Sequence, residues 1–281
     1  MLEGFPLIGI VTLGLAVTII AGELDLSVGS MAAFAATIAV LTTPVGLVGC
    51  VLIATSVGVV FGAVQGVLIA RLQINSLVFT IGTLILLRGL TYIFSGHAPI
   101  VISNIEITDI LLDRYGIFSV RSIVAIVVFV IAGLFLTYTR WGREIFAIGG
   151  ARNEAIAAGV PRVRPLAVSF AISAGCASLA GALAAMLGGS ASPQNYEDLL
   201  LSAAAAALLG GISLYGGRGT VLNVALGVAV LSLVGAGLAA RGSSASLVQL
   251  VTGGLLLAMI AIEFLAGRLT LQRSIFRRRA P

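Results

Sequence analysis

The sequence predicts an all-α fold, a polytopic transmembrane helix bundle of about nine spans in a single domain over residues 1–281. Of these residues 59% are hydrophobic and only 10% are charged, and the mean hydropathy is +1.16. A soluble chain of this length leaves about a quarter of its unfolded surface in water, and so few charged side chains do not cover that area. The remaining solvent is lipid. The composition excludes a disordered chain and a nucleic-acid-binding protein.

Nine apolar runs have, or approach, the length of about 17–25 residues that a helix needs to cross a bilayer. They cover residues 5–22, 26–42, 47–70, 77–95, 123–140, 166–190, 199–215, 220–240 and 246–266. The run at 199–215 is short and rich in alanine and glycine, which also fits a partial or re-entrant helix. Gly58, Gly62 and Gly66 follow one another at four-residue steps, which predicts a close contact between helices.

Arginine placement predicts the orientation of the bundle, because cytoplasmic loops are enriched in positive charge. Residues 140–165 contain five arginines and two glutamates, and the tail at 267–281 contains five arginines and no acidic residue. Both segments are therefore expected in the cytoplasm. The loop at 96–122 has more acidic than basic residues and is expected outside. This order places the N-terminus outside and suggests one more helix upstream of the chain.

Residues suited to catalysis or metal binding are scarce. All sixteen basic residues are arginine, so the lysine of a phosphate-binding loop is absent and the chain is not expected to hydrolyse ATP. His97 is the only histidine, and the two cysteines, Cys50 and Cys176, lie inside apolar runs. A zinc enzyme needs a larger set of such ligands. We expect no catalytic residue, no metal and no cofactor bound by this chain.

The first informative motif is GELDLSVGS at residues 22–30, in which Glu23 and Asp25 interrupt an apolar stretch. Charge at membrane depth is costly unless it lines water, meets a protein partner or lies at a broken helix end. A turn at the membrane surface explains the two carboxylates equally well.

Two short segments of the second half echo the first. GGISLYGG at 210–217 repeats the glycine spacing of GELDLSVG, and ASLV at 245–248 resembles NSLV at 75–78. Paired glycine-rich interruptions are typical of duplicated transporter bundles, whose broken helices border the transport path. Echoes of this length in glycine-rich sequence also arise by chance.

Arg88 lies about two thirds of the way along the predicted span 77–95. An arginine at that depth usually faces the protein interior, and the alternative is a side chain that reaches the outer membrane surface. By polarity and motif, the candidate residues of a translocation path are Glu23, Asp25, Ser27, Asn75, Thr80, Arg88 and Ser213. Further polar candidates within spans are Ser76, Thr83, Ser169, Ser173 and Ser202.

The basic loop at 140–165 contains a predicted short helix. Residues 151–158 are helix formers, Gly159 is a helix-ending residue, and Pro161 follows. A short helix between two spans is suited to docking a partner. The alternative is a solvated loop whose arginines only set the topology.

Taken together, these motifs resemble the permease subunits of bacterial ABC importers of the ribose, xylose, galactose and autoinducer type. GELDLSVGS resembles the GIDLSVGS signature of that family, and LLRG at 86–89 resembles its LxLRG element. GREIFAIGGARNEAIAAGV at 142–160 is similar to its cytoplasmic loop, and ALLGGISLYGGRGTVLNVALG at 207–227 is similar to its LGGTSLxGGxG stretch.

The resemblance implies a multi-pass permease of the bacterial inner membrane, with a cytoplasmic C-terminus, that translocates a sugar or sugar-like solute. It implies cytoplasmic ABC ATPase subunits that use the ATP, a periplasmic solute-binding protein, a second permease copy or paralogue, and contact with membrane lipid. Carried over by motif, the residues that couple to the ATPase are Gly149, Gly150, Arg152, Glu154, Ala155 and Gly159.

One other function stays open at this point. An ion-coupled secondary transporter of a small polar solute would use Glu23, Asp25 or Glu263 as a proton relay. Such a protein would transport without ATP and without a partner chain.

Overall fold

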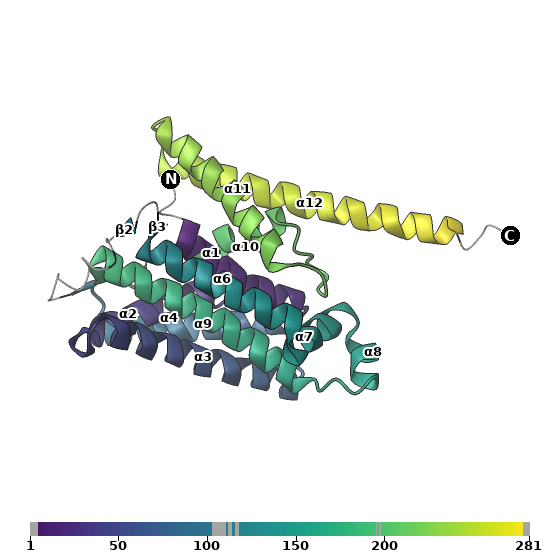
Figure 1. Ribbon diagram of the computed structural model, residues 1–281, viewed down its shortest axis with the longest axis horizontal. Helices are drawn as coiled ribbons and strands as arrows, with labels where there is room; N and C mark the ends of the chain where they lie inside the picture. The colour runs from purple at the N-terminus through teal and green to yellow at the C-terminus, as the bar shows by residue number, and fades with distance from the viewer. Residues whose placement is uncertain are drawn as a thin grey trace.

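The chain forms a helix bundle (Figure 1), and the computed structural model describes residues 5–102, 111, 114–115, 118–194, 196 and 198–277. In chain order the helices are α1 (Phe5–Ile20), α2 (Val28–Leu41), the 3-10 turn η1 (Thr43–Val45), α3 (Leu47–Leu72), α4 (Ser76–Ser95), α6 (Val120–Tyr138), α7 (Arg140–Gly150), α8 (Arg152–Ala157), α9 (Val163–Gly188), α10 (Leu199–Leu209), α11 (Val221–Ala240) and α12 (Ala245–Arg277). The described strands are two-residue pieces: β1 (Ile100–Val101) pairs antiparallel with β4 (Ser190–Ala191), and β2 (Arg114–Tyr115) with β3 (Phe118–Ser119). The predicted all-α class is confirmed.

Each of the nine predicted apolar runs coincides with a helix. Among the described residues, five helices are long and apolar enough to cross a membrane, namely α3, α4, α6, α9 and α11. The helices α1, α2 and α10 and the first half of α12 are apolar and shorter. With 11 residues, α10 rises about 16 Å, roughly half of the hydrocarbon core of a bilayer. This length agrees with the partial-helix alternative for the 199–215 run.

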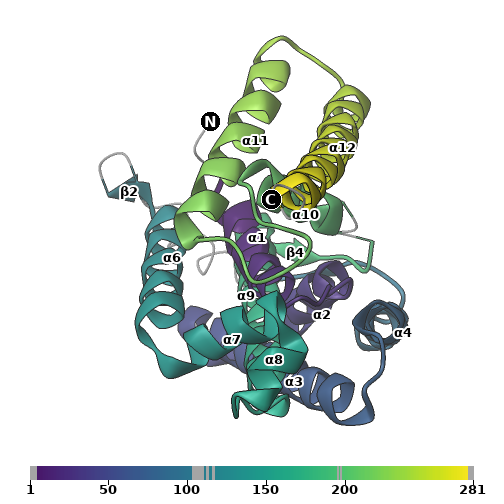
Figure 2. The same ribbon diagram turned by 90° about the vertical axis from the view of Figure 1, so that its right-hand side faces the viewer.

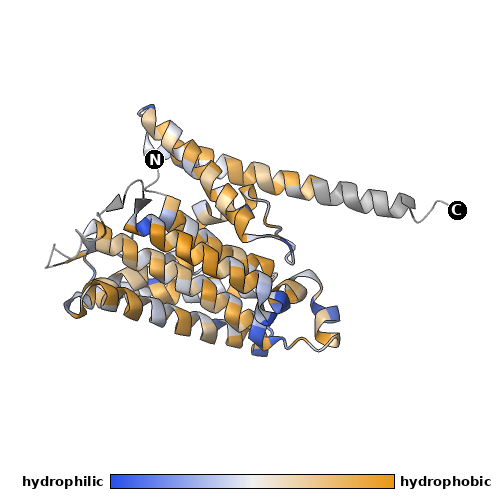
Figure 3. Ribbon diagram, viewed as in Figure 1, coloured by the Kyte–Doolittle hydropathy of each residue, from blue (hydrophilic) through white to orange (hydrophobic). Residues whose placement is uncertain are grey.

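Two helices form the centre of the bundle. Along α1, every residue from Gly9 to Ile20 is buried, and α1 packs against α6, α9, α10 and α11. Helix α9 packs against α1, α2 and α3, and the end-on view of Figure 2 shows α1 and α9 enclosed by the other helices. The outer helices α3, α4, α6 and α11 expose many large apolar side chains, seen as orange ribbons in Figure 3. Such an outer surface is suited to lipid.

The predicted glycine contact is confirmed and joins α3 to α9. A Cβ atom placed on Gly62 would lie 2.2 Å from the carbonyl oxygen of Phe170, and one on Gly66 would lie 2.5 Å from that of Leu166. A Cβ on Gly58 would lie 1.9 Å from the Oγ of Ser178. Because no side chain fits, the two helix backbones approach closely along α3 from Gly58 to Gly66.

Several turns and two short helices lie together at one end of the bundle, which we call the α8 end. It holds the α1–α2 interruption, the α3–α4 turn, helices α7 and α8, and the α10–α11 loop (Figures 1 and 2). The last turns of α12 extend toward the same end. The acidic residues of the predicted outer loop at 96–122 lie outside the described residues, as do residues 278–281. Up to Arg277 the predicted basic tail continues α12.

Candidate functional site

Asp25 is the buried centre of the interruption between α1 and α2, and its side chain is fully enclosed. The backbone N–H and the hydroxyl of Ser27 donate to Oδ1 at 3.0 and 2.5 Å. Ser173 of α9 donates to Oδ2 at 2.8 Å, and the amide of Gln65 on α3 donates to Oδ1 at 3.4 Å. These uncharged donors replace the water that a buried carboxylate loses. Asp25 therefore fastens the interruption to α3 and α9.

The neighbouring residue, Leu24, is held from the opposite side by α4. Its backbone N–H donates to Ser76 Oγ at 3.3 Å, and its carbonyl accepts from Thr80 Oγ1 at 3.4 Å. Ser76 and Thr80 are four residues apart and so share one face of α4. Two successive residues of the motif are thus bound to different helices.

Glu23 forms an ion pair with Arg152, the first residue of α8, with a distance of 2.6 Å between the carboxylate and guanidinium atoms. The glutamate side chain is 9% exposed and the arginine side chain 32%. A carboxylate with so little access to water needs a partner, since leaving it unpaired is costly. The pair joins the motif at 22–30 to the segment at 140–165.

We expect Arg152→Ala to lower the free energy of unfolding by roughly 1–3 kcal/mol, because it leaves the Glu23 carboxylate nearly buried and unpaired. The thermal unfolding midpoint in detergent measures this loss. The double variant Glu23→Gln/Arg152→Ala removes the unpaired charge and should regain most of the stability. Equal midpoints for wild type and Arg152→Ala would contradict the prediction.

Four glycines form a contact between three chain segments, here called the glycine junction: Gly22, Gly149, Gly216 and Gly217. The N–H of Gly217 donates to the carbonyl of Ile20 at 2.8 Å. A Cβ on Gly149 would lie 1.8 Å from that same carbonyl oxygen, and one on Gly216 would lie 2.9 Å from the Cα of Gly22. The two echoing interruptions therefore touch each other, and the C-terminal turn of α7 packs on both.

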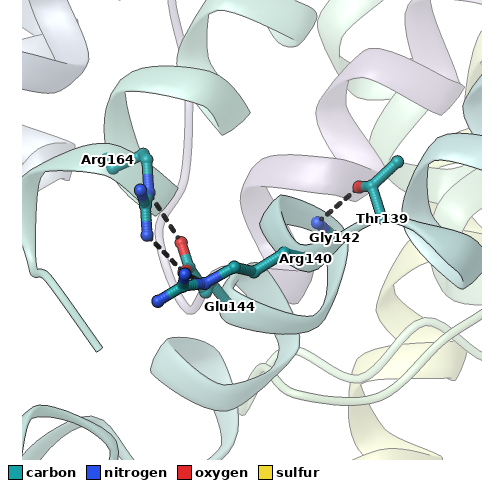
Figure 4. Close-up of polar contacts among 5 residues, drawn as sticks. All are labelled: Thr139, Arg140, Gly142, Glu144 and Arg164. Carbon is teal, nitrogen blue, oxygen red and sulfur yellow. Dashed lines mark hydrogen bonds and ion pairs between the residues drawn. The ribbon is translucent and has the colours of Figure 1, made fainter. Parts of the chain in front are cut away.

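Helix α7 is tied to the start of α9 by Glu144, as Figure 4 shows. The carboxylate accepts from Arg140 Nε at 3.0 Å and from Arg164 Nε at 2.9 Å, and a second nitrogen of Arg164 also contacts it. Thr139 begins the helix, because its hydroxyl accepts from the N–H of Gly142 at 3.1 Å. The two ends of the 140–165 segment are thereby joined.

Helix α8 agrees with the predicted short helix to within one residue at each end. Ala155 is buried in a small apolar cluster with Ile69, Ala70, Ile148, Leu166 and Phe170. Glu154 and Ile156 are exposed, and Gly159 has a φ of +89°, which favours glycine after a helix end. One face of α8 therefore anchors the helix and the other remains accessible.

Two cavities lie along the α1–α2 interruption. The inner cavity, at the α8 end, has a volume of about 430 Å³ and is lined by Gly22, Glu23, Leu24, Gln73, Ile74, Asn75, Ser76, Leu77, Arg152, Arg162 and Leu214. The outer cavity has a volume of about 120 Å³ and is lined by Leu26, Gly29, Ser30, Ala33, Leu84, Arg88, Pro193 and Leu200. Both contain polar and charged groups, whereas most of the outer surface of the bundle is apolar.

Comparison with known proteins agrees with a bundle of this kind. A family described as "Branched-chain amino acid transport system / permease component" matches residues 2–260. The chain belongs to this permease family. The permease is 32% identical over 274 residues to the L-arabinose ABC transporter permease protein AraH of Azospirillum brasilense, covering 94% of this chain and 78% of that one.

Two further relatives are named for other sugars. The ribose import permease protein RbsC of Escherichia coli (strain K12) is 28% identical over 90% of this permease and 81% of its own length. The galactose/methyl galactoside import permease protein MglC of Salmonella typhimurium is 29% identical over 91% of this permease and 82% of its own length. No solved structure matches the chain.

The predicted path residues of the permease occupy different positions in the structure. Asp25, Ser27 and Thr80 hold the interruption in place, and Arg88 lines the outer cavity. Asn75 begins α4, with its Oδ1 accepting from the N–H of Leu77 at 2.9 Å. The hydroxyl of Ser213 accepts from the N–H of Tyr215 at 3.3 Å in the α10–α11 loop. The side chain of Glu263 lies outside the described ones.

Gln65, Leu24 and helix α7 were not predicted as parts of the site. Gln65 is a lone amide in an apolar span, which is a detectable signal. Helix α7 was expected as loop, although Thr139 and the spacing of Trp141, Ile145 and Ile148 predict a helix. Nothing in the sequence distinguishes Leu24 as a site residue, because leucine is common throughout this permease.

Proposed function

We propose that this chain is the membrane-spanning permease subunit of an ATP-driven importer, and that it translocates a sugar or sugar-like solute delivered by a periplasmic binding protein. The observation that carries the proposal is the set of relatives named as ABC-type or import permeases for L-arabinose, ribose and galactose. Each is similar over nine tenths of this chain. The subunit catalyses no reaction; it opens and closes a path for the solute across the membrane.

The proposal assigns the α8 end to the cytoplasm and the chain to the inner membrane of a bacterium. The five arginines of 140–165 lie at that end together with the C-terminal turns of α12, which agrees with positive charge facing inward. The partners are cytoplasmic ABC ATPase subunits, the binding protein and a second permease copy or paralogue. ATP is bound by the ATPase, and this subunit needs no cofactor.

Coupling passes from α8 to the interruption. The ATPase docks on the exposed face of α8, where Ile156 is 38% exposed. Movement of α8 and α7 is then transmitted by the Glu23–Arg152 pair and by the glycine junction, because both connect directly to residues 20–23. The ion-coupled alternative gains no support: Glu23 is paired with arginine, and Asp25 is enclosed by uncharged donors.

The decisive experiment reconstitutes the permease with its ATPase and binding protein in liposomes. Uptake of labelled L-arabinose, D-ribose or D-galactose should require ATP, and the permease alone should accumulate none. Uphill accumulation by the permease alone would contradict the proposal.

Ile156→Asp tests the docking face in the same complex. We expect the ATPase to dissociate on purification and ATP-dependent uptake to fall at least tenfold, because a charge replaces an apolar contact. The thermal midpoint of the permease should not change, since the side chain is exposed. Val101→Asp, 73% exposed at the opposite end, is the matched control and should retain the ATPase. Retention of the ATPase by Ile156→Asp would place docking elsewhere.

A further inference from the structure

Each of the two cavities is lined by one leucine of the α1–α2 interruption. Leu24 lines the inner cavity and Leu26 the outer one. The residues that alternate with them, Asp25 and Ser27, are buried and hydrogen-bonded to each other. Leu24 and Leu26 thus face the cavities, while the carboxylate of Asp25 between them is bound by α3 and α9.

A single face of α4 forms a common wall of both cavities. Leu77 lines the inner cavity, and Leu84 and Arg88 line the outer one. These positions are spaced by seven and four residues, so they share one face of the helix. Thr80 lies on the same face, at the level where it binds the Leu24 carbonyl. The two cavities are therefore successive spaces along one side of α4.

The inner cavity has the size and chemistry to hold a small neutral polyol. Its volume of about 430 Å³ lies in the range of roughly 300–1,000 Å³ that is usual for small-molecule sites. Glu23, Gln73, Asn75 and Arg152 offer donors and acceptors that suit hydroxyl groups. The volume of the outer cavity, about 120 Å³, is below that range.

We propose that the two cavities are successive chambers of the solute path, and that Leu24 and Leu26 form the apolar barrier between them. This inference rests on the proposed function and names the barrier within it. The inner chamber is an exit site for an uncharged polyhydroxylated solute of monosaccharide size. The barrier moves when the contacts of Glu23 and Ile20 shift, because these residues lie one and four positions before Leu24 and contact α8, α7 and the α10–α11 loop.

Efflux from liposomes tests the barrier. The complex with Leu24→Ala/Leu26→Ala is reconstituted into liposomes loaded with labelled D-ribose, and efflux is followed without ATP. We expect efflux at least tenfold faster than from wild-type complex, because two large apolar groups are removed between the chambers. Leu52→Ala, exposed on α3 and outside both cavities, is the control that should stay as tight as wild type. Efflux at the wild-type rate from the double variant would overturn the proposal.

Thiol labelling gives a second readout that does not require the double variant to fold well. The native cysteines are buried, with Cys50 0% and Cys176 9% exposed. In ATP-free complex, a membrane-impermeant maleimide added on the α8 side should modify Leu24→Cys at least tenfold faster than Leu26→Cys. Equal rates would overturn the proposed barrier.

The two proposals can fail separately. If the wild-type complex imports no sugar with ATP, the proposed function is wrong. If it imports sugar but both barrier tests are negative, only the proposed barrier is wrong.

Discussion

Gly149→Ala is expected to reduce ATP-dependent sugar uptake to background. A Cβ at this position would lie 1.8 Å from the carbonyl oxygen of Ile20 and 2.8 Å from the backbone nitrogen of Gly217. Both atoms belong to backbone, so neither can rotate away as a side chain would. The added methyl group must push α7 from the two interruptions and disrupt the hydrogen bond between Gly217 and Ile20. Uptake in reconstituted liposomes measures the effect.

The adjacent glycine supplies a matched control. A Cβ on Gly150 would lie 3.6 Å from the Cα of Gly217, an ordinary van der Waals distance. Although the resemblance assigns Gly150 to the coupling residues, the space at this position predicts that Gly150→Ala transports like wild type. It should also stabilise α7 slightly, because alanine is favoured over glycine in helices by about 1 kcal/mol. Similar uptake by the two variants would show that the glycine junction does not carry the coupling.

Gly62→Leu is expected to lower the free energy of unfolding on the order of 3 kcal/mol, the upper part of the range for overpacked interiors. Its Cβ alone would lie 2.2 Å from the carbonyl oxygen of Phe170 and 2.7 Å from the Cβ of Ala174. Helix α9 also carries Ser173, so separation of α3 from α9 should loosen the Asp25 anchor as well. The thermal midpoint in detergent measures the loss.

Gly82→Leu provides the comparison for this stability test. Gly82 is exposed on α4, and a Cβ there would meet nothing within 4 Å. Its midpoint should stay at the wild-type value or rise, since leucine is a better helix former than glycine. A midpoint for Gly62→Leu as high as that of Gly82→Leu would show that the α3–α9 contact tolerates a large side chain.

Much of the fold could be predicted because lipid imposes simple rules. Helices in lipid satisfy their own backbone groups, so long apolar runs such as 47–70 and 166–190 gave helices close to α3 and α9. The glycine steps along α3 predicted a close contact correctly. Helix α7 was missed because its mixture of arginine, glycine and isoleucine falls below the length and apolarity of a span.

The candidate site was predictable only in part. Glu23 and Asp25 were identifiable because charge is rare in this chain, whereas their partners lie far away in sequence: Arg152 is 129 residues from Glu23, and Ser173 is 148 residues from Asp25. Periodicity and composition carry no information about such pairs. The echo of the two interruptions indicated a relation between them, and their direct contact emerges only in three dimensions.

Leu24 and Asp25 are adjacent residues that are bound to different helices. Helix α4 binds the backbone N–H and carbonyl of Leu24, and α9 binds the carboxylate of Asp25. If α4 and α9 slide apart, the chain cannot follow both. One set of hydrogen bonds must break in full before the α1–α2 interruption can move with the other helix, so intermediate positions lose bonds without gaining new ones. Movement of the interruption is therefore expected to be abrupt, with two well-populated positions and few between them.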